Sequence, residues 1–351
     1  MLPQHKPYII GETAFHHEGD LDFLNSLIAK GEELGFDALK FHVTVDLDDY
    51  MVANHEAIDV IRPWCFNEEE WDKILSNIKK TDIILLCNDL QSIKYANSCQ
   101  YPIRALEIHA TGLNDVFLLE EASKFKGTVI LGTGGSTLDE IEFAIQFLIQ
   151  NGHDDIFLMH GFQNYPTDVK DIKLERMEKL QALFNLPIGY ADHTDPNDKN
   201  NAFISCLGIA RGFNILEKHF TTNFGEKRID AQAAINENQI NQIKELATII
   251  YNSLGSDNPL EMSTAELKYG NTGPMKKAIV ASKDLNEGDK LALNDIAFKR
   301  TNIPAKLKQN QLQLLLGLTL TKSINKDEII DLEAVNYEFQ PQDISQFKNT
   351  K

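Results

Sequence analysis

Short apolar runs alternate with amphipathic stretches along the N-terminal part of the chain. The runs are rich in β-branched and aromatic residues, which is typical of strands buried on both faces of a parallel sheet. Eight of them occur, at residues 8–14, 38–43, 82–88, 105–111, 128–134, 155–161, 187–193 and 214–220. Between them, apolar residues repeat at helical spacing in stretches such as 21–34, 68–80, 138–150 and 170–184.

Eight strand–helix units in succession predict a closed (β/α)8 barrel, also called a TIM barrel. The alternative is an open, doubly wound sheet, which normally has fewer strands and a glycine-rich nucleotide-binding turn directly after the first strand. At that point this chain has Glu12-Thr13-Ala14. We therefore expect the closed barrel.

The texture of the sequence changes after the helix expected at 237–254. Residues 255–274 contain Gly, Pro, Ser, Asn and Thr with little periodicity and are predicted to be a linker. Short strands and turns follow, and the segments near Asp284 and Ser323 share a strand–turn–strand pattern. The predicted domains are a barrel at 1–254, a small β-rich domain at 275–340 and a polar tail at 341–351.

The predicted strands become polar in their last positions. Because the carboxyl ends of all eight strands meet at one mouth of a barrel, where active sites lie, these side chains are expected to gather there. A single histidine at a strand end is equally well explained by a structural hydrogen bond, but the whole set is not. The set consists of Glu12, Lys40, His42, Asn88, Glu107, His109, Thr133, His160, Asp192, His193, Glu217 and His219.

Composition and charge exclude several classes of protein. No apolar run approaches the roughly 20 residues that a membrane-spanning helix needs. The 52 Asp and Glu against 34 Lys and Arg give a formal net charge of −18, which repels nucleic acid. The four cysteines have no CxxC spacing, and no secretory signal is evident at the N-terminus. We therefore expect reduced thiols in a cytoplasmic protein.

Several strand-end residues stand in motifs that occur in the same order in a known family. The motifs are Glu12 with His17-Glu18-Gly19, Lys40, Tyr165-Pro166-Thr167, GYADHT at 189–194, ILEKHFT at 215–221, Asp230 and the segment 275–300. Together they resemble the sialic acid synthase family, the N-acetylneuraminate synthases and relatives that make similar nonulosonic acids. The resemblance covers nearly the whole chain and implies a TIM barrel joined to a C-terminal antifreeze-like (SAF) domain.

The resemblance also implies a reaction, a cofactor and residue roles. Family members condense phosphoenolpyruvate with an open-chain N-acylated hexosamine and release phosphate, and a divalent cation (Mn²⁺, Mg²⁺ or Co²⁺) polarises the sugar aldehyde. Matched by motif, His193 and His219 are the implied metal ligands. The implied catalytic residues are Glu12, Lys40 and Asp192, the last by orienting His193. The implied substrate-binding residues are Thr133, Gln163, Tyr165, Asp230, Arg300 and Glu107.

The same resemblance implies a homodimer. In the family, the SAF domain of one chain covers the barrel mouth of its partner, and an arginine there contacts the amino sugar. That position is Arg300 in this chain. The family's following P-G-x-G is replaced here by Thr301-Asn302-Ile303-Pro304.

The fourth strand departs from the family pattern. Where the family has K-I-G-S-G-E, this chain has Glu107 to Gly112, so an anion replaces the cation that binds phosphoenolpyruvate. Small hydroxyl residues are also replaced, by Gly132 on strand five and Ala191 on strand seven. A carboxylate facing a trianionic substrate would repel it.

Two hypotheses follow. The first keeps the synthase reaction, with an altered phosphoenolpyruvate clamp or a shifted alignment in strand four. The second is a divergent member that has lost phosphoenolpyruvate and acts as a metal-dependent aldolase or lyase, or as a carbohydrate-binding protein. Under the second hypothesis, His42, His109 and His160 would widen the metal site or supply acid–base groups near neutral pH.

Overall fold

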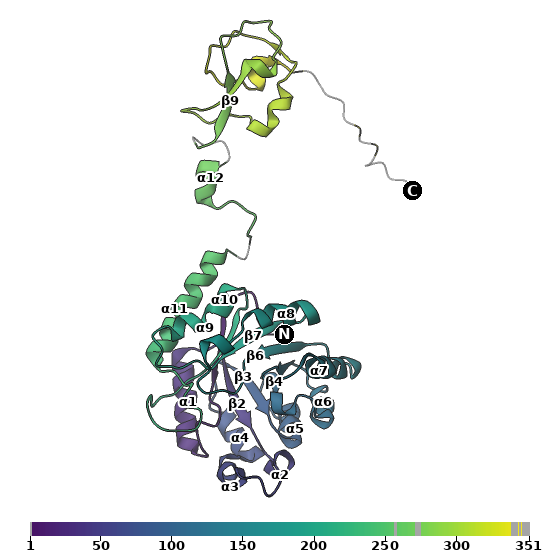
Figure 1. Cartoon of the computed structure of the whole chain (residues 1–351), viewed down its shortest axis with the longest axis vertical. Coiled ribbons are helices and arrows are strands. Elements are labelled where there is room, and N and C mark those ends of the chain that lie inside the picture. Colours follow the sequence, from purple (N-terminus) through teal and green to yellow (C-terminus); the bar gives the residue numbers. More distant parts are fainter. Residues whose placement is uncertain (1, 256–257, 271–274, 338–342, 344, 346–351) are drawn as a thin grey trace. The chain divides into compact units, whose positions relative to one another are not determined.

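The computed structural model describes residues 2–255, 258–270, 275–337, 343 and 345, and the chain forms two compact units, Met1–Asp257 and Asn258–Lys351. The first unit is a closed barrel of eight strands in sequence order (Figure 1). Neighbouring strands pair in parallel, and β8 pairs with β1 to close the ring. The strands are β1 Tyr8–Glu12, β2 Ala38–Val43, β3 Asp82–Cys87, β4 Ile103–Ile108, β5 Thr128–Gly132, β6 Ile156–His160, β7 Ile188–Asp192 and β8 Ile215–His219. The predicted (β/α)8 barrel is confirmed.

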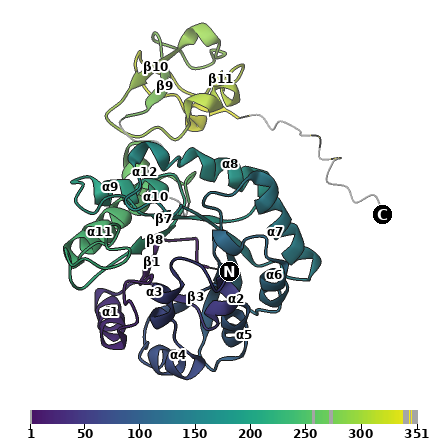
Figure 2. The ribbon, with the colours of Figure 1, turned by 60° about the horizontal axis from the view of Figure 1, so that its bottom comes forward.

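Helices surround the barrel (Figure 2). They are α1 Leu21–Leu34, α2 Leu47–Tyr50, α3 Ile58–Ile61, α4 Glu68–Leu75, α5 Leu90–Ser98, α6 Val116–Ala122, α7 Leu138–Gln150, α8 Glu175–Phe184, α9 Asn201–Ser205, α10 Leu207–Ala210 and α11 Glu237–Leu254. Asp20 begins α1 by accepting a hydrogen bond from Phe23 N, and Gly35 ends it in the left-handed conformation that glycine adopts without strain. Two amphipathic stretches are longer than their helices, since α4 ends at residue 75 and α8 begins at residue 175.

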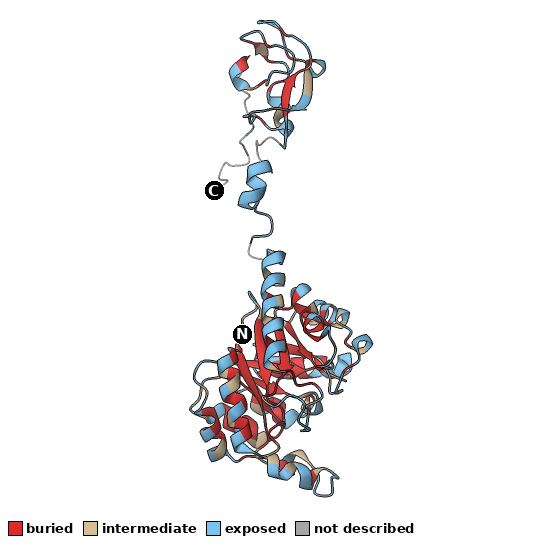
Figure 3. Cartoon of the chain, turned by 90° about the vertical axis from the view of Figure 1, so that its left-hand side faces the viewer, coloured by how far each residue is buried: buried red, intermediate tan, exposed pale blue. Residues whose placement is uncertain are grey.

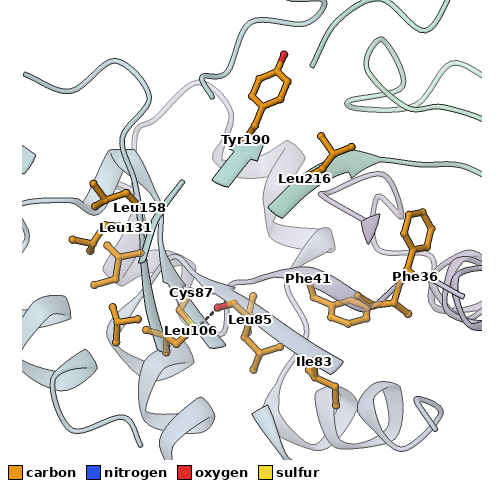
Figure 4. Packing of buried hydrophobic residues seen from close by; sticks show 14 of the residues in the cluster. Phe36, Phe41, Ile83, Leu85, Cys87, Leu106, Leu131, Leu158, Tyr190 and Leu216 are labelled. Atoms are coloured by element: carbon orange, nitrogen blue, oxygen red, sulfur yellow. Dashed lines mark hydrogen bonds between the residues drawn. The ribbon is translucent and has the colours of Figure 1, made fainter. Parts of the chain in front are cut away.

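Two apolar layers hold the first unit together. Outward-facing strand residues pack against the helices, and Figure 4 shows part of this layer, with Phe41, Leu85 and Leu216 among its members. Inward-facing residues such as Ile84, Ile130 and Phe157 fill the barrel itself. Figure 3 accordingly shows the strands as buried and the helices as exposed on their outer side. The filled interior leaves only the ends of the barrel open to ligands.

The second unit is small and β-rich, and it has its own apolar core. Strands β9 (Lys277–Ala281) and β10 (Ile296–Arg300) pair antiparallel, as do β11 (Thr319–Leu320) and β12 (Val335–Asn336). The two segments with a shared pattern meet, because Leu285 and Ile324 exchange backbone hydrogen bonds. Short 3-10 helices η4 (Leu293–Asp295), η5 (Gln309–Leu314) and η6 (Leu332–Ala334) complete the unit.

Some predicted segments fall at the edge of what the structure describes. The expected linker, 255–274, contains the helix α12 (Thr264–Gly270), while residues 256–257 and 271–274 lie outside the described residues. Of the polar tail at 341–351, the structure describes only residues 343 and 345. Among the described helices, none combines the length and apolar character needed to cross a membrane.

A tight contact beneath the mouth gives a test of the packing. A Cβ on Gly11 of β1 would lie 2.8 Å from Phe36 Cδ2 and 3.0 Å from Phe220 Cε1. Both rings are buried, so we expect Gly11→Ala to lower the free energy of unfolding by about 1–3 kcal/mol. Urea denaturation measures the change. The control is Gly208→Ala in α10, where the added Cβ meets Tyr190 at an ordinary 3.4 Å; equal stability of the two variants would contradict the prediction.

Candidate functional site

A cavity of about 360 Å³ lies at the carboxyl end of the barrel. Most of the sequence-predicted site residues of the barrel meet there, although they come from distant parts of the chain. The predicted residues that line it are Glu12, Lys40, Glu107, Gln163, Tyr165 and His193, and they are joined by His42, His109 and Glu217. The barrel topology alone accounts for this gathering, because every strand ends at the same mouth.

A carboxylate and two imidazoles form a compact cluster at this mouth. One ligand atom from each of Glu12, His193 and His219 lies within 4.8 Å of the others, and all three residues are buried. Glu12 Oε2 is 3.0 Å from His219 Nε2, and Glu12 Oε1 is 2.8 Å from His42 Nε2. The ring of Tyr165 packs against both imidazoles, with centroids 5.0 Å from His193 and 5.5 Å from His219.

The chemistry of this cluster fits a divalent cation. The Nδ1 atoms of His193 and His219 are buried and have no hydrogen-bond partner among the described residues. Burial and the neighbouring His219 lower the pKa of His193 to about 3, so that its imidazole is neutral. Burial alone would raise the pKa of Glu12, but Lys40 and His219 outweigh it and keep the carboxyl ionised. Two imidazoles and one carboxylate form a ligand set that suits Mn²⁺ and related ions.

Lys40 is paired with Glu12 in the strand register and is surrounded by carboxylates. Its Nζ is 2.7 Å from Glu107, 2.9 Å from Glu217 and 3.4 Å from Glu12. Burial alone would lower the pKa of Lys40, but the three glutamates raise it well above its usual value. Lys40 is therefore a permanent cation whose charge is already fully offset.

The structure places Glu107 of β4 inside the cavity, at the position where the family motif has a lysine. The described β4 residues that face inward are Ala105 and Glu107, so neither inward position holds the family's lysine. Burial raises the pKa of Glu107 despite the attraction of Lys40, and burial with the nearby Glu12 raises the pKa of Glu217 well above its usual value.

Other predicted residues lie away from the cavity. Thr133 directs its hydroxyl to the Met159 carbonyl oxygen, 3.0 Å away, and His160 Nε2 donates to the Ile172 carbonyl oxygen at 2.7 Å. Asp230 lies in the loop after β8 and does not line the cavity, although its charge contributes to raising the pKa of Tyr165. Arg300 ends β10 in the second unit.

Asp192 lies on the outer face of β7. Its carboxylate accepts hydrogen bonds from Lys218 Nζ at 2.7 Å and from Tyr190, Thr194 and Ser205, rather than from the ring of His193. Asp192 and Lys218 are fully buried, and they are paired residues of adjacent strands. Each directly precedes a histidine of the cluster. The ion pair therefore joins β7 to β8 at the height of His193 and His219.

Glu217 is the residue of the cavity to which sequence reasoning gave no role. A signal for it existed, because Glu217 precedes His219 by two positions and a strand turns such residues to the same side. The same alternation separates Lys218 and Asp192 from the cavity.

The buried pair yields a stability prediction. Lys218→Met leaves Asp192 as an unpaired buried charge, so the free energy of unfolding should fall by about 3–5 kcal/mol in urea denaturation. The double variant Asp192→Asn with Lys218→Met should recover much of that loss, because neither charge remains. A Lys218→Met protein as stable as wild type would contradict the assignment.

Comparisons with known proteins agree with the fold and the motifs. The NeuB family model matches residues 32–258, and the SAF domain model matches residues 276–336. The chain is 26% identical over 343 residues to the N,N'-diacetyllegionaminic acid synthase of Campylobacter jejuni, covering 93% of this chain and 99% of that protein. It is 24% identical over 364 residues to the N-acetylneuraminate-9-phosphate synthase of Drosophila melanogaster, covering 92% and 94%.

A solved structure supports the same conclusion for the fold. The N-acetylneuraminic acid (sialic acid) synthetase of Leptospira borgpetersenii superposes with a TM-score of 0.67 at 23% identity, over 75% of this chain and 90% of that one. The resemblance inferred from the sequence motifs is therefore confirmed. The NeuB family model covers most of the barrel, and the SAF domain follows it in the sequence. The chain therefore belongs to the NeuB family.

Proposed function

We propose that the protein is a nonulosonic acid synthase-type enzyme that forms a carbon–carbon bond at the carbonyl group of an N-acylated hexosamine. The single observation that carries the proposal is the buried cluster of Glu12, His193 and His219 at the barrel mouth. Two of its relatives are named as synthases of N,N'-diacetyllegionaminic acid and of N-acetylneuraminate 9-phosphate. The proposal is that this chain is a synthase of the same kind.

The residues of the cluster have distinct roles in the proposed reaction. A bound Mn²⁺, Mg²⁺ or Co²⁺ supplies Lewis acidity to the sugar carbonyl. Glu12, His193 and His219 would hold the cation. Tyr165 covers the two imidazoles on one side and limits the access of water to them. His42 Nε2 donates a hydrogen bond to Glu12 and fixes the direction of its carboxylate.

Two of the proposed sugar-binding residues, Gln163 and Tyr165, line the cavity. We retain Asp230 and Arg300 as proposals for contacts that form when the sugar is bound. The hydroxyl and the backbone N–H of Thr133 both donate to the Met159 carbonyl oxygen, so the hydroxyl of Thr133 could contact the sugar only as an acceptor. Asp192 supports the reaction by holding the strand end that carries His193.

The second substrate, whose carbon adds to the sugar carbonyl, is phosphoenolpyruvate if this chain follows the family. A second candidate function is a metal-dependent aldolase or lyase reaction without phosphoenolpyruvate. The surroundings of Lys40 favour this candidate, because a carboxylate and a phosphate oxygen 4 Å apart repel by about 4 kcal/mol at an effective dielectric constant of about 20. A carbohydrate-binding protein without catalysis is the remaining alternative, and it would be indifferent to chelation.

We also propose a homodimer in which the SAF domain of one chain covers the barrel mouth of the other. In support, Arg300 lines a recess of about 740 Å³ on the second unit. A planar guanidinium can donate to a sugar hydroxyl pair or an N-acyl oxygen. The four cysteines are free thiols, which fits the proposed cytoplasmic location.

Metal binding tests the proposed function directly. Isothermal titration of the metal-free protein with Mn²⁺ should give one site per chain, and His193→Ala and His219→Ala should each weaken binding at least tenfold. Formation of a carbon–carbon bonded product, followed by mass spectrometry, should stop on chelation and resume with Mn²⁺. His55→Ala, a change at an exposed histidine, is the control. Full Mn²⁺ affinity in either cluster variant would remove that histidine from the site.

Mixing of variants tests the shared site. Arg300→Ala chains and His193→Ala chains should each be inactive or weakly active alone, and a mixture should regain activity because a mixed dimer contains one intact composite site. Each variant re-mixed with itself is the control. A monomer in analytical ultracentrifugation, or confirmed heterodimers without recovered activity, would exclude the arrangement.

A further inference from the structure

The cavity contains a charged group that the proposed metal chemistry does not use. This group, called the floor, consists of Lys40, Glu107 and Glu217, and Lys40 Nζ contacts both carboxylates at 2.7 and 2.9 Å. All three side chains are at least nine-tenths buried. A ligand that enters this part of the cavity loses water, so each of its polar groups needs a hydrogen-bond or charge partner there.

The charges of the lining do not suit a phosphate group. Among the described residues that line the cavity, Lys40 is the one lysine or arginine, whereas Glu12, Glu107, Glu140 and Glu217 bring carboxylates. A phosphorylated ligand would therefore meet four carboxyl groups of the protein and a single lysine.

The shape of the floor leaves room next to Glu107. A Cβ at position 132 would lie 3.5 Å from Glu107 Oε1 and 3.1 Å from Ala110 N, so that Gly132 keeps this space open. Ala191, Leu86 and Met159 line the neighbouring wall with apolar groups. The floor thus offers hydrogen-bond acceptors and apolar surface. A ligand that fits it must bring its own O–H or N–H groups.

We propose that this floor binds an uncharged, hydroxyl-bearing carbonyl compound as the second substrate, and that Glu107 excludes phosphorylated compounds. The proposal rests on the proposed function and names the substrate class of that same site. Hydroxyl groups of the ligand donate to Glu107 and Glu217, while Lys40 stays paired with both. Ala191 and Met159 contact its carbon skeleton.

The reaction with such a substrate balances without a further reactant. The C–H bond next to the ligand's carbonyl breaks, and its proton goes to a carboxylate of the floor. The released electron pair forms the new carbon–carbon bond to the sugar carbonyl carbon, whose oxygen takes up a proton. The overall change is an aldol addition, and no phosphate is released.

A matched pair of probes tests the proposal. Dihydroxyacetone and dihydroxyacetone phosphate differ only in the phosphate group, and phosphoenolpyruvate is the third probe. Binding to the full-length, Mn²⁺-loaded protein is measured by ligand-observed NMR at constant ionic strength. Wild type should bind dihydroxyacetone at least tenfold more tightly than either phosphorylated probe. Glu107→Lys should bind phosphoenolpyruvate at least tenfold more tightly than wild type, and Glu107→Gln should show a smaller gain.

Controls distinguish a failure of this substrate proposal from a failure of the proposed function. Glu120→Lys makes the same change of charge on the exposed face of α6 and should leave all three affinities unchanged. Glu107→Gln keeps the test valid if two neighbouring lysines prevent folding of Glu107→Lys. Tight binding of phosphoenolpyruvate by wild type, no binding of dihydroxyacetone, or no gain in a folded Glu107 variant would each overturn the proposal. Failure of Mn²⁺ to bind would instead overturn the proposed function, which is a separate measurement.

Discussion

The ion cluster around Lys40 is the interaction on which the rest of the site depends. One ammonium group neutralises part of the charge of three glutamates that reach it from β1, β4 and β8. Without it, the floor of the barrel would hold several mutually repelling carboxylates in a dry environment. With it, Glu12 stays ionised and keeps one oxygen directed to His219 and the other to His42. The geometry of the candidate metal site is therefore built on this charge balance.

Much of the fold followed from the sequence because it is set by local pattern. Continuous apolar runs mark strands that are buried on both faces, and eight of them in series close a barrel. The meeting of Glu12, Lys40, Glu107 and His193 required only that strand ends converge. These residues therefore reached the cavity as expected.

The remaining details depend on contacts that no run of residues reveals. Thr133, directly after β5, is an implied substrate-binding residue, but its hydroxyl donates to the Met159 carbonyl oxygen. The family resemblance implies that Asp192 orients His193, whereas strand alternation turns its carboxylate outward to Lys218. The burial of Lys40 among three carboxylates depends on the stagger of four strands, and so the balance of charge at the floor became visible only in three dimensions.

The position of Glu12 connects the two halves of the site. Its carboxylate belongs to the cluster that suits a cation and also lies 3.4 Å from Lys40. A cation held by Glu12 competes with Lys40 for that negative charge, and this leaves Lys40 more strongly committed to Glu107 and Glu217. A cation bound at Glu12 would therefore alter the affinity of the group formed by Lys40, Glu107 and Glu217 for its ligand. Thermodynamic linkage requires the reverse effect to be equal in size.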